Sequence, residues 1–186
     1  TIYISTSGSE DNDGLSPNSP KKEVQNIATY LKQGYNVKLK RGDSWYLPTG
    51  SITLKDIHGT EDAPLVIGAY GSGDALPAIG FMMKIENGAW KLVDEKRNVY
   101  AADVSSLGQQ YGISVHRCFV NDEAYFHKNR TNYVALDAGE YCSYDGTLYV
   151  RMPVGEAPSR VEVTQYGGSK RLNIEDVSHL TIEYIH

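Results

Sequence analysis

The spacing of hydrophobic residues in the first part of the chain changes at Gly34. Before it, four apolar residues follow the i, i+3, i+4, i+7 spacing of one helix face: Val24, Ile27, Ala28 and Leu31. Ser19 followed by Pro20 is a typical helix start, and Gly34 can end a helix in a left-handed conformation. The pattern therefore predicts one amphipathic helix over residues 20–33.

Beyond Gly34, and also over residues 1–5, apolar and polar residues alternate with the period of a β-strand. The apolar centres recur in steps of about 12 to 15 residues, at Leu39, Leu54, Ile67 and Ile79. A regular return of this kind is typical of a solenoid, in which each turn of the chain stacks on the one before it.

The regular recurrence of apolar strand centres is lost between residues 81 and 158. There, Tyr144-Asp145-Gly146 predicts a hairpin, and the segment as a whole predicts several antiparallel strands that form an inserted or appended subdomain. Regular strands resume over residues 159–186. The predicted organisation is therefore a first part at 1–80, an inserted β subdomain at 81–158 and a continuing coil at 159–186.

Apolar strand residues continue to Ile185, and His186 follows with no polar closing segment. Solenoids need polar caps, because an uncapped last layer would expose its apolar face to water. We therefore expect further coils C-terminal to His186, or a partner that covers this end.

Composition narrows the class of protein. The chain of 186 residues has 14 Tyr, 18 Gly and 7 Pro, which favours an all-β domain with many turns. A net charge of −5 argues against a nucleic-acid partner held by bulk electrostatics, and no apolar run is long enough to predict a membrane span. Cys118 and Cys142 could pair between neighbouring strands or remain two buried thiols.

The N-terminal segments resemble the N-terminal cap of secreted right-handed parallel β-helix proteins, the pectate-lyase-like family. The matching pieces are Tyr3-Ile4-Ser5, the loop Gly8-Ser9-Glu10-Asp11-Asn12-Asp13-Gly14, and Ser19-Pro20 with its short helix. Residues 37–45 are similar to the strand and turn that enter the first coil, and residues 63–73 and 77–79 extend the likeness. Phe119-Val120-Asn121-Asp122 and residues 146–151 resemble a small β insertion of some bacterial members.

The resemblance implies an all-β fold: the start of a right-handed parallel β-helix with a cap strand, a cap helix and an inserted antiparallel subdomain. It also implies a secreted protein, extracellular, periplasmic or on the cell surface, with a polysaccharide as its partner. We expect a polysaccharide lyase acting on an acidic polysaccharide. A glycoside hydrolase of the same fold, or a non-catalytic carbohydrate-binding or adhesin module, is the alternative.

In such enzymes the catalytic groups lie on later coils. We therefore assign no catalytic residue to this chain and expect it to be inactive by itself. No metal site or cofactor is predicted, although the resemblance leaves calcium possible in the full-length protein. The loop from Ser9 to Pro20 fails the EF-hand pattern, because Pro20 would stand where an acidic ligand is needed. Arg41-Gly42-Asp43 matches the integrin tripeptide, but a turn between strands explains it.

The stretch at 127–133 carries the candidate substrate-binding residues His127, Lys128, Arg130 and Tyr133. β-Elimination of a uronic acid needs a cation for the carboxylate, a base for the proton and an acid for the leaving oxygen. These residue types suit that chemistry. The alternative is an exposed polar loop in which Arg130 braces the subdomain, and no acidic residue nearby in sequence would orient His127.

Overall fold

The computed structural model describes residues 1–48, 50–107, 114–128, 132–165 and 171–186. Strands dominate these residues, with one short α-helix and a few 3-10 turns, so the prediction of a mostly β chain is confirmed. The chain forms two compact units. Unit 1 comprises Thr1–Gly80 with Ser169–His186, and unit 2 comprises Phe81–Gly168.

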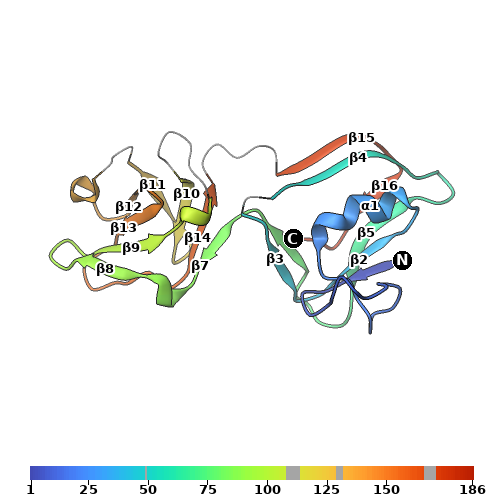
Figure 1. Cartoon of the computed structure of the whole chain (residues 1–186), viewed down its shortest axis with the longest axis horizontal. Helices are drawn as coiled ribbons and strands as arrows, with labels where there is room; N and C mark the ends of the chain where they lie inside the picture. Colours follow the sequence, from blue (N-terminus) through green and yellow to red (C-terminus); the bar gives the residue numbers. More distant parts are fainter. Residues whose placement is uncertain (49, 108–113, 129–131, 166–170) are drawn as a thin grey trace. The chain divides into compact units, whose positions relative to one another are not determined.

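Every strand pair described in unit 1 is parallel. The largest sheet has the order β1-β2-β5-β16, with β1 at Ile2–Ile4, β2 at Val37–Lys40, β5 at Leu65–Tyr70 and β16 at Leu180–Ile182. Two smaller sheets pair β3 (Ser44–Tyr46) with β6 (Ala78–Gly80), and β4 (Ile52–His58) with β15 (Leu172–Ser178). Figure 1 shows β4 and β15 running side by side.

The chain visits these three sheets in one fixed order. It runs through β2, β3 and β4, then through β5, β6 and β15, and then enters β16. Unit 2 is inserted in the sequence between β6 and β15. Each turn therefore places its apolar residues beside those of the previous turn, as Ile67 beside Val37 and Ile174 beside Leu54. The predicted recurrence at Leu39, Leu54, Ile67 and Ile79 reflects this winding.

The helix begins later than its sequence pattern predicts. A 3-10 turn, η1 (Val24–Asn26), leads directly into α1 (Ile27–Lys32). Pro20 and Lys21 are not helical, because Lys21 pairs with β1: its N–H donates to Tyr3 O and its carbonyl accepts from Ser5 N. The helix end at Gly34 is confirmed, with φ of 82° and its N–H donating to Leu31 O.

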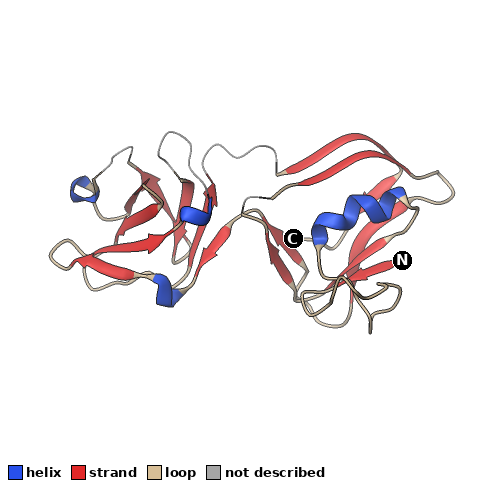
Figure 2. Ribbon diagram, in the orientation of Figure 1, coloured by secondary structure: helices blue, strands red, loops and turns tan. Residues whose placement is uncertain are grey.

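Unit 2 is one eight-stranded sheet that curls around its own core (Figure 2), with the order β7-β14-β10-β11-β12-β13-β9-β8. Its strands are β7 (Met83–Ile85), β8 (Lys91–Asp94), β9 (Val99–Asp103), β10 (Val115–Val120), β11 (Glu123–His127), β12 (Glu140–Tyr144), β13 (Thr147–Arg151) and β14 (Val161–Gln165). Neighbours are antiparallel, as predicted, except that β11 and β12 are parallel.

Two tight hairpins organise this sheet. Asn121 and Asp122 connect β10 to β11 with φ of 51° and 70°, and Asp145 and Gly146 connect β12 to β13 with φ of 50° and 71°. Consecutive positive φ values at a two-residue loop are the signature of a type I′ turn, which matches the twist of the flanking strands. The hairpin predicted at Tyr144-Asp145-Gly146 is therefore confirmed.

The predicted start of the third part at residue 159 is wrong. β14 (Val161–Gln165) pairs antiparallel with β10 and β7, inside unit 2. The reason is burial: Val161 and Val163 are fully enclosed in the core of that unit. The parallel winding resumes only at β15, whose first residue is Leu172.

The two cysteines are free and buried. Cys118 on β10 belongs to the core cluster on the inner face of the sheet. Cys142 on β12 follows inward-facing Tyr141 and so points to the outer face. With β11 between them, the two strands lie about 10 Å apart, which is too far for a disulfide.

No helix within the described ranges has the length and apolar character needed to cross a membrane.

Candidate functional site

The candidate site lies at the end of β11 and in the connection from β11 to β12. His127 is the last residue of β11, Lys128 follows it, and Tyr133 begins a 3-10 turn, η4 (Tyr133–Ala135). Arg130 lies outside the described residues. Leu136 follows the turn and is buried, which fixes this part of the connection against the sheet.

The structure places His127 and Lys128 on opposite faces of the sheet. The His127 ring packs on Tyr141, a core residue of the inner face, with 5.1 Å between ring centroids. Lys128 Nζ instead lies 2.8 Å from Glu140 Oε1, and Glu140 points outward. Alternation along the strand explains the separation. Burial, with a smaller contribution from His116, lowers the pKa of His127 and favours its neutral form.

Tyr133 belongs to a column of three stacked tyrosines. Its ring lies 4.9 Å from Tyr149 on β13, and Tyr149 lies 4.9 Å from Tyr144 on β12, with interplanar angles of 18° and 14°. Burial, reinforced by the Tyr149 hydroxyl, raises the pKa of Tyr144 above its ordinary value. One face of the Tyr133 ring is thus occupied within the protein, and the column ties η4 to the sheet.

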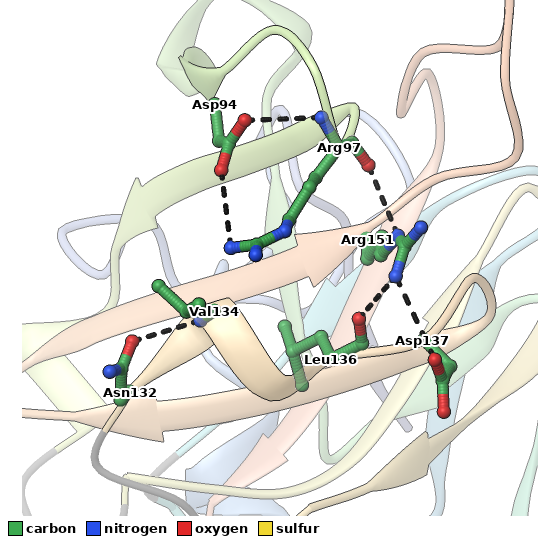
Figure 3. A network of polar contacts seen from close by, with 7 residues as sticks. All are labelled: Asp94, Arg97, Asn132, Val134, Leu136, Asp137 and Arg151. Carbon is green, nitrogen blue, oxygen red and sulfur yellow. Dashed lines mark hydrogen bonds and ion pairs between the residues drawn. The ribbon is translucent and has the colours of Figure 1, made fainter.

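Arg151 on β13 anchors the same segment, as Figure 3 shows. Its Nη1 donates to Leu136 O over 2.6 Å and lies 3.7 Å from Asp137 Oδ1, while its Nε donates to Arg97 O over 3.2 Å. The Arg151 guanidinium therefore joins two surface segments.

Each of these segments also has a hydrogen bond of its own. At the turn that contains Arg97, Asp94 Oδ1 accepts from the Arg97 N–H. At the start of η4, Asn132 Oδ1 accepts from Val134 N.

The carboxylates near this stretch have structural partners. Glu140 accepts from Asp137 N through Oε2 and pairs with Lys128 through Oε1. Burial acts to raise the pKa of Glu140, but the Asp137 N–H and the Lys128 ammonium outweigh it, so the pKa is lowered. Asp122, at the hairpin, lies 2.8 Å from Arg160 Nη1. Neither carboxylate is arranged as an acid or base for glycoside chemistry.

The features that resembled other motifs also have local roles. Asp43 of the Arg-Gly-Asp tripeptide accepts from Ser5 Oγ over 2.7 Å and from Thr6 N over 2.8 Å, so it holds the N-terminal strand. In the acidic loop, Asp13 Oδ1 accepts from Leu15 N, and Glu10 accepts from the N–H groups of Lys22 and Glu23. Among the described residues, no group of three or more metal-binding side chains comes together.

The sequence pattern does not single out two residues of this region, Arg151 and Phe126. Arg151 falls in a predicted strand, and nothing in its local pattern shows which carbonyls it reaches. Phe126 lies in another strand, and its ring is 75% exposed on β11. In the structure Tyr125 packs on the core, and strand alternation then turns Phe126 outward. The sequence shows that the two adjacent rings face opposite sides of a strand, but not which of them faces the core. The substrate-binding role of His127, Lys128, Arg130 and Tyr133 stays a prediction.

Comparison with known proteins gives one curated relative. The chain is 26% identical, over 198 aligned residues, to the lacto-N-biosidase of Bifidobacterium longum subsp. longum. The alignment covers the whole of this chain but only 12% of that enzyme. No protein-family model matches the chain.

At least two solved structures share the fold. One is a glycoside hydrolase, with a TM-score of 0.53 and 16% identity, for which the match covers 89% of this chain and 34% of the other. The second is XylC in complex with xylose, with a TM-score of 0.63 and 15% identity over 87% of this chain and 31% of the other. In every one of these comparisons the chain corresponds to a minor part of a longer protein.

Proposed function

We propose that the chain is part of a carbohydrate-active enzyme, a glycoside hydrolase built on a right-handed parallel β-helix. The observation that carries this proposal is the relation to a lacto-N-biosidase along the entire chain, across both units. A relation limited to one unit would point only to a shared module. Because the alignment spans both units, it favours the same arrangement in the two proteins: a parallel winding of strands that is interrupted by an inserted β unit.

The winding of unit 1 supports the β-helix part of the proposal. Three parallel sheets visited in a fixed order, with equivalent residues stacked between turns, are what a parallel β-helix requires. Solved structures that share the fold include a glycoside hydrolase and a xylose complex of XylC. They favour a role in carbohydrate chemistry.

Hydrolysis replaces the lyase chemistry expected from the sequence. Elimination at a uronic acid needs a cation near a base and an acid. In the described part of the 127–133 stretch, Lys128 is paired with Glu140 and His127 lies on the other face of the sheet, so these two residues do not form such a pair. The relatives that have named activities are hydrolases. His127, Lys128, Arg130 and Tyr133 remain our candidate sugar contacts in the longer enzyme, and of these Lys128 and Tyr133 share the outer face.

We propose that the catalytic groups lie in parts of the longer enzyme outside these 186 residues, because the chain corresponds to only 12% of the lacto-N-biosidase to which it is similar. In unit 1 three apolar strand residues are strongly exposed: Leu172 at 49%, Ile174 at 54% and Ile182 at 45%. His186 donates to Pro77 O and accepts from Ile79 N, which are the bonds of a residue paired in parallel with Ala78.

The proposed cellular location of the enzyme follows from its proposed glycan substrate. We propose that the enzyme acts outside the cell, in the extracellular space, in the periplasm or at the cell surface, where polymeric and oligomeric glycans are met.

The test uses the full-length protein that contains this chain, with p-nitrophenyl lacto-N-bioside, xylan and polygalacturonate as substrates. We expect release of nitrophenol or of reducing sugar, without the ultraviolet absorbance of an unsaturated product. The 186-residue chain assayed beside it should be inactive. Formation of an unsaturated product would instead support the lyase function. Binding of the substrate without turnover would favour the non-catalytic carbohydrate-binding module.

A further inference from the structure

The outer face of β10 and β11 carries an apolar strip that the core does not use. Phe119 on β10 lies directly opposite Ala124 on β11, and Phe126 follows two residues later on the same side of that strand. The flanking residues Cys118, Val120 and Tyr125 point to the core. We refer to Phe119, Ala124 and Phe126 as the Phe119–Phe126 strip. Phe126 is 75% exposed, Ala124 is exposed and Phe119 is half-buried.

An ion pair closes each end of the strip. Glu140 is the cross-strand partner of Phe126 and is held by Lys128 at 2.8 Å. At the other end, Glu162 is the partner of Phe119 and lies 3.6 Å from Arg160, which also holds Asp122 at 2.8 Å. The side chains of Glu140 and Glu162 are only 12% and 16% exposed, so their carboxylates are fixed in place.

We propose that the Phe119–Phe126 strip binds a neutral pyranose oligosaccharide, an inference that rests on the proposed carbohydrate function of the chain. The exposed Phe126 ring offers a flat apolar face on which the C–H face of a sugar ring can stack. The Lys128 ammonium at one end and the Arg160 guanidinium at the other donate to sugar hydroxyl groups, and the carboxylates beside them accept from such groups. An apolar platform bordered by fixed hydrogen-bonding groups matches the two-sided chemistry of a sugar.

Charge selects a neutral ligand over an acidic one. Among the described residues, three cations lie beside the strip, Lys128, Arg160 and exposed Arg117, and so do three carboxylates, Glu140, Asp122 and Glu162. Two further ion pairs border it and cancel in charge: Arg151 with Asp137 next to Glu140, and Lys84 with Glu86 next to Glu162. The sum is zero, so the face offers no net attraction to a polyuronate, and its fixed carboxylates would repel one. Neutral hexoses, pentoses and N-acetylhexosamines meet no such penalty.

The test titrates the 186-residue chain with lacto-N-biose, xylobiose and trigalacturonate, followed by amide chemical shifts and by saturation transfer to the sugar. We expect one neutral sugar to shift the amides of β10 and β11. Phe126→Ala should weaken that binding about tenfold, whereas Phe126→Tyr keeps it within about twofold. Val154→Ala is the control, because it trims an apolar side chain that is 95% exposed elsewhere in unit 2 and lies outside the strip.

Three results would overturn the proposal: no binding of either neutral sugar, tighter binding of trigalacturonate, or equal affinity of the wild type and Phe126→Ala. A dimer in sedimentation that Phe126→Ala dissociates would also overturn it, because the strip would then belong to an interface between copies. Binding needs no turnover, so a negative result here leaves the hydrolase assay on the full-length protein independent.

Discussion

Asp56 and Asp176 occupy the same position in neighbouring turns of unit 1, and both have a left-handed backbone, with φ of 53° and 51°. They sit between the paired residues Lys55–Glu175 and Ile57–Val177. The left-handed residue resets the strand alternation, so that Leu54 and Ile57, three residues apart, are both buried. Repetition of the same kink in the next turn keeps the two turns in register.

This kink predicts a residue-specific effect on stability. Asp56→Gly should leave the free energy of unfolding nearly unchanged, because glycine adopts positive φ without strain. Asp56→Val should lower it by about 1–2 kcal/mol, since a β-branched residue is poorly tolerated there. Denaturant unfolding of unit 1 measures both, and Thr53→Val, at an exposed position of the same strand, is the control. Equal losses in the free energy of unfolding for Asp56→Gly and Asp56→Val would contradict the claim that the effect comes from the left-handed backbone.

The Lys128–Glu140 pair predicts a pH dependence. The pKa of Glu140 is lower in the folded state than in the unfolded chain, so the ionised carboxylate stabilises the fold above the ordinary carboxyl pKa. That contribution is lost as the pH falls through the lowered pKa. Glu140→Gln should therefore be less stable than the wild type near neutral pH, with the difference shrinking in acid. Glu123→Gln, at an exposed residue of β11, should show no such convergence.

The Arg151 anchor predicts a local effect on the loop that contains η4. Arg151→Ala removes the donors to Leu136 O and Arg97 O and should cost about 1–3 kcal/mol. Arg151→Lys should restore little of this, because a single ammonium lacks the planar fork that reaches two segments. Amide exchange should accelerate at residues 132–138, and the near-ultraviolet dichroism of the tyrosine column should weaken. Exchange that is unchanged in both variants would argue against the anchor.

The buried thiols predict slow chemical modification. Cys118 and Cys142 are free and enclosed, and burial raises the pKa of Cys142 to about 11, so little thiolate forms near neutral pH. Both should react with Ellman's reagent only after unfolding, giving two equivalents in denaturant and almost none in the native state. Fewer than two equivalents from unreduced, denatured protein would indicate a disulfide and contradict the placement of these residues on opposite faces.

The sequence predicted the structure correctly where a pattern depends only on residues close together in the chain. The apolar face of α1, the stop at Gly34 and the turn at Asp145-Gly146 all depend on residues close in the chain, and each is present. The strand at Val161 was misassigned because its alternation is the same in a parallel coil and in an antiparallel sheet. Only its burial partners, Ile85 on β7 and Val120 on β10, decide between the two.

The candidate site was harder to predict for the same reason. Consecutive residues such as His127 and Lys128 looked like one cluster, yet a strand separates them onto two faces. The partners that define their environment, Tyr141 and Glu140, come from the next strand. Neither contact can be derived from spacing along the chain.

The central claim is that the full-length protein cleaves a glycan by hydrolysis, and heavy-oxygen water tests it most directly. Hydrolysis places an oxygen from the solvent in the product, whereas elimination places none. We predict that digestion in water enriched with oxygen-18 yields sugars carrying one heavy oxygen at the new reducing end, as seen by mass spectrometry. Cleaved products without the label, and with a mass lower by one water, would contradict the account.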